Sequence, residues 1–226
     1  MKSDLRLDLH VHSRHSPDSD LPVATIGQRL AYTGLRGVAL TDHNTIAGHA
    51  ELSELARAYP GYLFLPGVEV STLEGHLLVY GVSELPPIHR PIEETVEWVR
   101  AHGGESVLSH PFRRRHGVGR RLAETVRVDG IEARNGHNSE VSNLRAELLA
   151  AQRNLAATGG SDVHALADLG RAFTTFPEEA RTVDDLLEAI RRRRTAPGGR
   201  SLHWAGRLRN GVVNVGKFFS RGFRSV

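Results

Sequence analysis

Short apolar runs alternate with amphipathic segments along most of the chain. The runs predict buried strands at 5–12, 37–41, 62–71, 76–82, 105–109, 128–135, 156–161 and 172–176. Apolar residues at helical spacing predict helices between them, at 24–33, 45–58, 92–102, 122–127, 141–153 and 183–194. Glycine or proline stands at most of the joints, where it ends one element before the next begins.

This alternation of strand and helix predicts βα units around a mainly parallel sheet. About seven units favour a closed barrel over an open sheet, although residues 1–190 are few for a full eight-unit barrel. No GxGxxG motif follows the first strand, which argues against a dinucleotide-binding domain. We therefore expect a compact or incomplete (βα) barrel.

Charge divides the chain into two parts. Residues 189–226 hold ten of the 29 lysines and arginines and none of the 26 acidic residues. Residues 1–188 are therefore acidic overall, although the whole chain carries a formal charge of +3. We expect a barrel over residues 1–190 and a basic C-terminal extension over residues 191–226.

The extension begins with four consecutive arginines, a pattern that is typical of a solvated surface. It also carries aromatic side chains among its basic ones: Trp204, Phe218, Phe219 and Phe223. Aromatic rings beside cations suit single-stranded nucleic acid, and the same composition suits a peripheral membrane contact or packing on the barrel. Nucleic-acid contact is our hypothesis for this segment, beside those two alternatives.

Composition excludes several classes of protein and of active site. Hydrophobic residues make up 39% and charged residues 24%, as in soluble globular proteins, and no run approaches the 18 apolar residues of a membrane span. The absence of cysteine excludes disulfides, thiolate catalysis, iron–sulfur clusters and cysteine-ligated zinc. Asp4, Arg6 and Asp8 interrupt the apolar stretch that a signal peptide needs, so we expect a cytoplasmic location.

Many of the thirteen histidines, and several carboxylates, stand where a predicted strand begins or ends. His10 and His12 are two apart on a strand, so both side chains leave the same face. Asp162 and His164 repeat this spacing after a glycine pair. Further residues of this kind are Asp42, His43, Glu69, His76 and His110. Because the carboxyl ends of parallel barrel strands meet at one rim, these groups are expected to converge.

Imidazole and carboxylate donors without thiolates suit Zn²⁺, Mn²⁺ or iron. Nine candidate donors are too many for one ion with an open position. They suffice for two or three divalent ions that share a bridging carboxylate. Such a cluster acidifies water, supplies hydroxide near neutral pH and clamps a substrate oxygen.

Six short motifs resemble, in type and order, those of the PHP (polymerase and histidinol phosphatase) domain family of metal-dependent phosphoesterases. They are LDLHVHSRHSPDSD, LTDHNT, GVEVSTLEGHLLVYG, SHP, IEARNG and GGSDVH, and the resemblance covers residues 5–176. It implies a distorted, compact (βα)7 TIM-like barrel, a trinuclear metal site and hydrolysis of phosphate esters.

The resemblance also implies a set of metal ligands: His10, His12, Asp18, His43, Glu69, His76, His110, Asp162 and His164. Glu69 would be the bridging carboxylate, and Asp42 would orient a neighbouring group. The family places a carboxylate or a histidine shortly after the HxH pair. His15, Asp18 and Asp20 compete for that position, and the SPDS context favours Asp18.

The expected reaction is hydrolysis of a phosphomonoester or phosphodiester by a metal-bound hydroxide. The candidate catalytic residues are Asp42, His110 and His137. His110, His43 or His137 could protonate the leaving group wherever it is not a metal ligand.

Arg113 and Arg171 are the candidate phosphate-binding residues, since a guanidinium matches two phosphate oxygens. Nucleotides or the ends of nucleic-acid strands are the favoured substrates. The alternatives are a histidinol-phosphate phosphatase, an amidohydrolase that uses the same cluster, and a non-catalytic PHP module. The two lysines of the chain, Lys2 and Lys217, lie outside the predicted strands and helices, which counts against the amidohydrolase. The intact donor set counts against the non-catalytic module.

Overall fold

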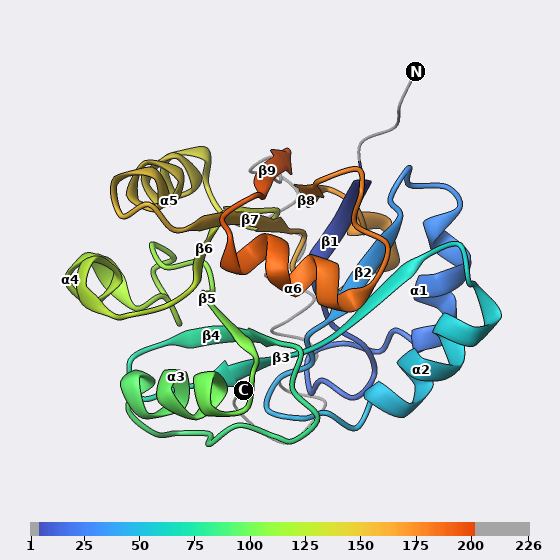
Figure 1. The fold of residues 1–226 in the computed structure, drawn as a ribbon, viewed down its shortest axis with the longest axis horizontal. Helices are drawn as coiled ribbons and strands as arrows, with labels where there is room; N and C mark the ends of the chain where they lie inside the picture. The colour runs from blue at the N-terminus through green and yellow to red at the C-terminus, as the bar shows by residue number, and fades with distance from the viewer. Residues whose placement is uncertain (1–4, 202–226) are drawn as a thin grey trace.

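The computed structural model describes residues 5–201, which form a mixed α/β barrel that is nearly closed (Figure 1). The strands of this part are β1 (Leu5–Val11), β2 (Gly37–Leu40), β3 (Leu63–Ser71), β4 (His76–Tyr80), β5 (Glu105–Leu108), β6 (Gly130–Asn135), β7 (Ala156–Gly160), β8 (Ala172–Phe176) and β9 (Ala196–Gly199). Its α-helices are α1 (Val23–Leu30), α2 (His49–Ala58), α3 (Ile92–Ala101), α4 (Gly119–Thr125), α5 (Glu140–Gln152) and α6 (Val183–Arg191). The TIM-like barrel that the sequence predicts is therefore confirmed.

The strands follow the order β7-β6-β5-β4-β3-β2-β1-β8-β9 around the sheet. The pairs β1–β2, β2–β3, β5–β6 and β6–β7 are parallel, whereas β3–β4, β4–β5, β1–β8 and β8–β9 are antiparallel. The expectation of a mainly parallel sheet is therefore wrong. Only residues 72–75 separate β3 from β4, too few for the crossover that a parallel pair requires.

The ring closes where β7 meets β1. The backbone amides of Asp162 and Val163 donate to the carbonyl of His10, at 2.8 and 3.2 Å. Gly160 permits this approach, because a Cβ on it would lie only 2.3 Å from the Cβ of His10. The close contact brings the end of β7 beside the two histidines of β1.

The helix α6 covers the end of the barrel where β1, β2 and β3 begin. Figure 1 shows it lying across the strands. Thr182 and Asp185 form a capping box that starts the helix, and Leu186 and Ile190 pack into a core that includes Tyr80. With this end filled by apolar side chains, the polar groups gather at the opposite end.

The strand β9 follows α6 and adds to the sheet edge beside β8. Its Ala-Pro-Gly-Gly sequence has no strand pattern, so the sequence does not predict this strand. The arginine run before it forms surface ion pairs, in which Arg192 contacts Glu188 and Arg194 contacts Glu179. The four aromatic residues of the predicted extension lie outside the described residues. Within residues 5–201, no helix is long and apolar enough to cross a bilayer.

Candidate metal centre

The candidate ligands come together at one rim of the barrel because of where their strands end. His10 lies in β1 and Glu69 in β3, and His110 stands two residues after the end of β5. The strand β4 runs in the opposite direction, and its first residue, His76, pairs with the last residue of β3, Ser71. Antiparallel pairing therefore places an amino-terminal strand end at the same rim as the carboxyl ends of β1 and β3.

Glu69 lies at the centre of this group and is fully buried. Its Oε2 atom lies 3.0 Å from His10 Nε2, 3.3 Å from His12 Nε2 and 3.3 Å from His43 Nδ1. Its Oε1 atom lies 3.0 Å from His76 Nδ1 and 3.1 Å from His110 Nε2. One carboxylate therefore faces five imidazoles, as a bridging ligand would.

The other three candidate ligands extend the group on one side. Asp162 Oδ1 lies 3.4 Å from His12 Nε2. Asp18 Oδ2 lies 2.6 Å from His164 Nε2 and 3.3 Å from His43 Nε2. These nine residues form one connected set, which we call the Glu69 cluster: His10, His12, Asp18, His43, Glu69, His76, His110, Asp162 and His164.

Of the residues that compete with Asp18, the structure places His15 outside the cluster. His15 Nε2 contacts Glu51 Oε1 on α2, at 2.8 Å. The carboxylate of Asp42 accepts hydrogen bonds from the backbone amide and hydroxyl of Ser13, at 2.6 and 2.7 Å. Asp42 thus holds the loop that follows His12.

Charges inside the cluster compensate for its burial. Burial alone would raise the pKa of Glu69, but His10, His43 and His76 lower it well below its usual value. Burial alone would lower the pKa of His10, but Glu69 and Glu132 raise it well above its usual value. Without cations, protons shared between imidazoles and carboxylates therefore balance the charge, and cation binding would release them.

The donors fit divalent cations. Three overlapping sets each bring their ligand atoms within 4.8 Å of one another: His12, His43 and His164; His10, His12 and Glu69; His43, Glu69 and His76. Three buried ring nitrogens in the cluster have no hydrogen-bond partner, namely His12 Nε2, His43 Nδ1 and His110 Nδ1. Nitrogen and oxygen donors with unshared lone pairs suit Zn²⁺, Mn²⁺ or iron.

Of the two candidate phosphate-binding arginines, Arg113 contacts the cluster directly, whereas Arg171 contacts Asp168 outside it. Arg113 Nη2 donates to Asp162 Oδ2 at 2.6 Å, and its Nε donates to Asn138 Oδ1 at 3.0 Å. Arg171 Nη2 donates to Asp168 Oδ1 at 2.8 Å. Two buried N–H donors in this region have no partner, Asn138 Nδ2 and Arg171 Nε.

His137 is close to the cluster without belonging to it. Its ring centre lies 5.9 Å from that of His164, and its Nε2 lies 3.9 Å from Asp168 Oδ2. Burial lowers its pKa to about 4, so the imidazole is neutral at pH 7. His137 can therefore contact a substrate group that approaches the cluster.

Glu132 is a buried residue of the site that lies within the motif IEARNG, although the sequence alone predicts no role for it. Its Oε1 lies 2.8 Å from His10 Nδ1, and its Oε2 accepts the backbone amide of His110 at 2.8 Å. Asn135 Nδ2 donates to both oxygens. The available signal was a lone carboxylate between Ile131 and Ala133 in a strand that is otherwise buried.

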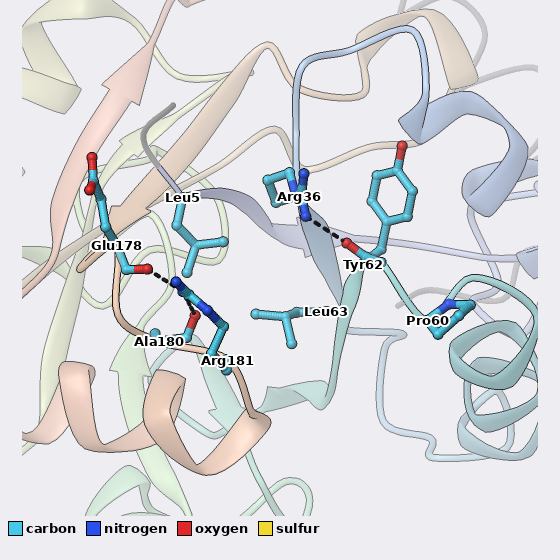
Figure 2. A pocket seen from close by; sticks show the side chains of 9 residues that line it. Leu5, Arg36, Pro60, Tyr62, Leu63, Glu178, Ala180 and Arg181 are labelled. Atoms are coloured by element: carbon cyan, nitrogen blue, oxygen red, sulfur yellow. Dashed lines mark hydrogen bonds between the residues drawn. The ribbon is translucent and has the colours of Figure 1, made fainter. Parts of the chain in front are cut away.

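A separate cavity of about 430 Å³ lies at the opposite end of the barrel (Figure 2). Leu5 and Leu63, which begin β1 and β3, line it together with two arginines. Arg36 donates to the carbonyl of Gly61, and Arg181 donates to that of Ala180. Both guanidinium groups therefore donate to backbone carbonyls next to the cavity. None of the residues that line the cavity belongs to the Glu69 cluster.

Comparison with known proteins adds independent information on this rim. A family model described as PHP domain matches residues 8–118, and a second, described as PHP-associated, matches residues 140–195. Between them, the two matched spans contain every residue of the Glu69 cluster.

Individual relatives are distant. Over 153 residues, which are 62% of this chain and 88% of the relative, the chain is 29% identical to an uncharacterised protein from Methanocaldococcus jannaschii. Over 87 residues, 35% of this chain and 30% of the relative, it is 34% identical to a 3′,5′-nucleoside bisphosphate phosphatase from Chromobacterium violaceum. A solved structure of a proposed metal-dependent phosphoesterase from Bifidobacterium adolescentis matches with a TM-score of 0.62, at 19% identity, over 89% of this chain and 98% of that one. That likeness shows the fold alone.

Proposed function

The chain belongs to the PHP family, and from this membership we propose that it is a metal-dependent phosphoesterase whose active site is the Glu69 cluster. The observation that carries the proposal is the single carboxylate of Glu69 facing five imidazoles at one rim of the barrel. Divalent cations bound there would acidify a water molecule and neutralise charge on the phosphoryl oxygens.

We propose that the cluster holds two or three Zn²⁺, Mn²⁺ or iron ions. Two of the three donor sets share Glu69, two share His12 and two share His43. Sharing of this kind supports neighbouring ions that are bridged by a carboxylate.

The substrate phosphoryl group is held by Arg113 and Arg171, with help from the amide of Asn138. Asn138 Nδ2 and Arg171 Nε are unpartnered N–H donors, which cannot bind a cation and are free to donate to phosphate oxygens. Guanidinium groups supply such charge-assisted hydrogen bonds to phosphate oxygens. Arg113 also contacts Asp162, which places the phosphoryl-binding groups next to the proposed cation ligands.

His137 interacts with the leaving oxygen of the ester. Among the three histidines considered for this role, His43 and His110 both contact Glu69 and are assigned here as ligands. The neutral ring of His137 can donate a hydrogen bond to that oxygen at pH 7, although its low pKa makes full proton transfer a minor contribution.

Nucleotides or the ends of nucleic-acid strands are the proposed substrates. The name of the Chromobacterium violaceum relative supports this choice, and so do the two candidate phosphate-binding arginines. The proposed tail contact rests on the basic and aromatic composition of residues 202–226. Oligonucleotide binding that weakens steeply with salt, and more so in the full chain than in one ending at Ser201, would support it.

The test is a hydrolysis screen with cation-loaded protein. Mononucleotides, nucleoside bisphosphates, short oligonucleotides, sugar phosphates and histidinol phosphate would be compared, each with and without chelator. We expect chelator-sensitive release of phosphate, fastest from the nucleotides. A preference for histidinol phosphate would replace the substrate assignment. Cation binding without cleavage of any P–O bond would favour the non-catalytic PHP module.

A further inference from the structure

Glu132 lies behind the cluster and is directed toward two of its members. Its side chain is almost completely buried. It extends from β6 and contacts His10 in β1 and the backbone of His110 after β5. Its two oxygens accept different hydrogen bonds, one from the ring of His10 and one from the backbone of His110. No other carboxylate contacts His10 Nδ1 within residues 5–201.

The contact with His10 determines which ring nitrogen can bind a cation. A neutral imidazole carries one proton, and a carboxylate at Nδ1 holds that proton there. The lone pair is then on Nε2, the atom that lies 3.0 Å from Glu69 and 3.7 Å from Asp162. Carboxylates that orient metal-binding histidines in this way strengthen the ligand and fix its ring.

The second contact stabilises an unusual backbone conformation. His110 has a φ of +29°, which a residue with a side chain rarely adopts. Its amide donates to Glu132 Oε2, and its ring Nε2 reaches Glu69 Oε1. The same carboxylate therefore orients ligands on two strands, one through a ring and one through the main chain.

We propose that Glu132 is a positioning residue that presents His10 Nε2 to a divalent cation and keeps His110 directed into the cluster. The inference rests on the proposed function only in assuming that the Glu69 cluster binds cations. It requires no particular substrate.

The substitution Glu132→Gln tests this with little change in shape. Its carbonyl oxygen must accept the His110 amide, because two N–H groups would otherwise face each other. Its NH₂ group then faces His10 Nδ1, so the ring proton moves to Nε2 and the lone pair there is lost. We expect Co²⁺ or Mn²⁺ to bind about ten- to a hundredfold more weakly, with an altered Co²⁺ absorption spectrum.

Glu105→Gln is the matched control, because Glu105 is also a buried strand glutamate and contacts no member of the cluster. It should leave the affinity for Co²⁺ and the spectrum unchanged. Equal cation affinity in wild type and Glu132→Gln would overturn the inference. Absence of cation binding by the wild type would instead refute the proposed function.

A measurement on the wild type covers the case in which Glu132→Gln does not fold. In Zn²⁺-loaded protein, nitrogen NMR of the ring of His10, assigned with a His10→Gln variant, should show a protonated Nδ1. An Nδ1 that carries no proton, or that itself binds Zn²⁺, would overturn the inference.

Discussion

Glu69 contacts five imidazoles of the cluster, and it raises the pKa of two of them, His10 and His12. Both of its oxygens are occupied, and Ser109 donates to one of them at 2.7 Å. Buried imidazoles that lose such a partner become neutral or move apart.

Glu69→Gln is expected to abolish tight cation binding and to lower phosphoesterase activity more than about a hundredfold. The amide keeps the shape of the side chain but cannot bridge two cations. Metal analysis and a p-nitrophenyl phosphate assay would measure the two effects. Glu51→Gln, which alters a half-buried contact with His15, should change neither. Full activity in Glu69→Gln would contradict the proposed site.

Glu105 predicts a pH dependence of stability that is separate from the cluster. Burial raises its pKa from 4.5 to about 7, with a further contribution from Asp129, while Arg191 opposes the shift. Between these two values the folded chain keeps the proton that the unfolded chain has lost. The free energy of unfolding should therefore fall as the pH rises from 4.5 to 7.

Denaturant unfolding of wild type and Glu105→Gln at several pH values would measure this contribution. Glutamine resembles the protonated acid, so the variant should gain stability relative to the wild type as the pH rises through that window. A difference between the two proteins that does not change with pH would contradict the assignment.

At this scale, sequence spacing could predict the ligands but not what supports them. His10 and His12, or Asp162 and His164, are two residues apart, and that local signal survives in a single sequence. Glu132 meets His10 across 122 positions of the chain, and no local pattern specifies that contact.

Among the elements, the contact between β1 and β7 brings Asp162 and His164 to the other ligands of the Glu69 cluster. The strand β7 carries Asp162 and His164 toward the histidines of β1 through direct backbone hydrogen bonds. Gly160 stands at the contact, where its missing side chain leaves room for His10.

Gly160→Ala should destabilise the protein by about 1–3 kcal/mol, because the added methyl group would overlap His10. It should also weaken cation binding, since β1 and β7 would separate. Thermal unfolding and cation titration would measure the two effects. Gly61→Ala is the control, because a Cβ there would meet nothing within 4 Å. Comparable loss in both variants would argue against a tight contact at this joint.

The order and kind of the elements could be predicted from periodicity, and the four residues between the predicted strands at 62–71 and 76–82 already require an antiparallel pair. The direction of β8 and the last strand could not be predicted, because they depend on which neighbours these segments meet in the fold. The sequence of β9 is Ala-Pro-Gly-Gly, and it becomes a strand only because β8 offers it an edge.

For the molecule as a whole, the cluster links cation binding to stability. It buries seven polar side chains and half-buries two more, Asp18 and His164, at one end of the barrel, opposite the apolar packing of α6. Ion pairs between histidines and carboxylates compensate for this burial when cations are absent, and cations that bind only the folded state add stability.

Removal of cations should therefore lower the melting temperature without unfolding the protein at 25 °C. At a hundred times the dissociation constant, one bound cation adds about 2.7 kcal/mol. For a chain of this length that corresponds to roughly 5–10 °C. Thermal unfolding with chelator, and after addition of Zn²⁺ or Mn²⁺, would measure the shift. An unchanged melting temperature would indicate that the cluster binds no cation.

The contact between β7 and β1 also determines when, during translation, the Glu69 cluster can be completed. His10 and His12 leave the ribosome first, and Asp162 and His164 follow about 150 residues later, which at 5–20 residues per second is an interval of roughly 8–30 s. Throughout that interval the nascent chain displays a histidine pair that lacks its partners from the far strand. Loading with ions can therefore reach completion only once translation of the barrel is nearly finished.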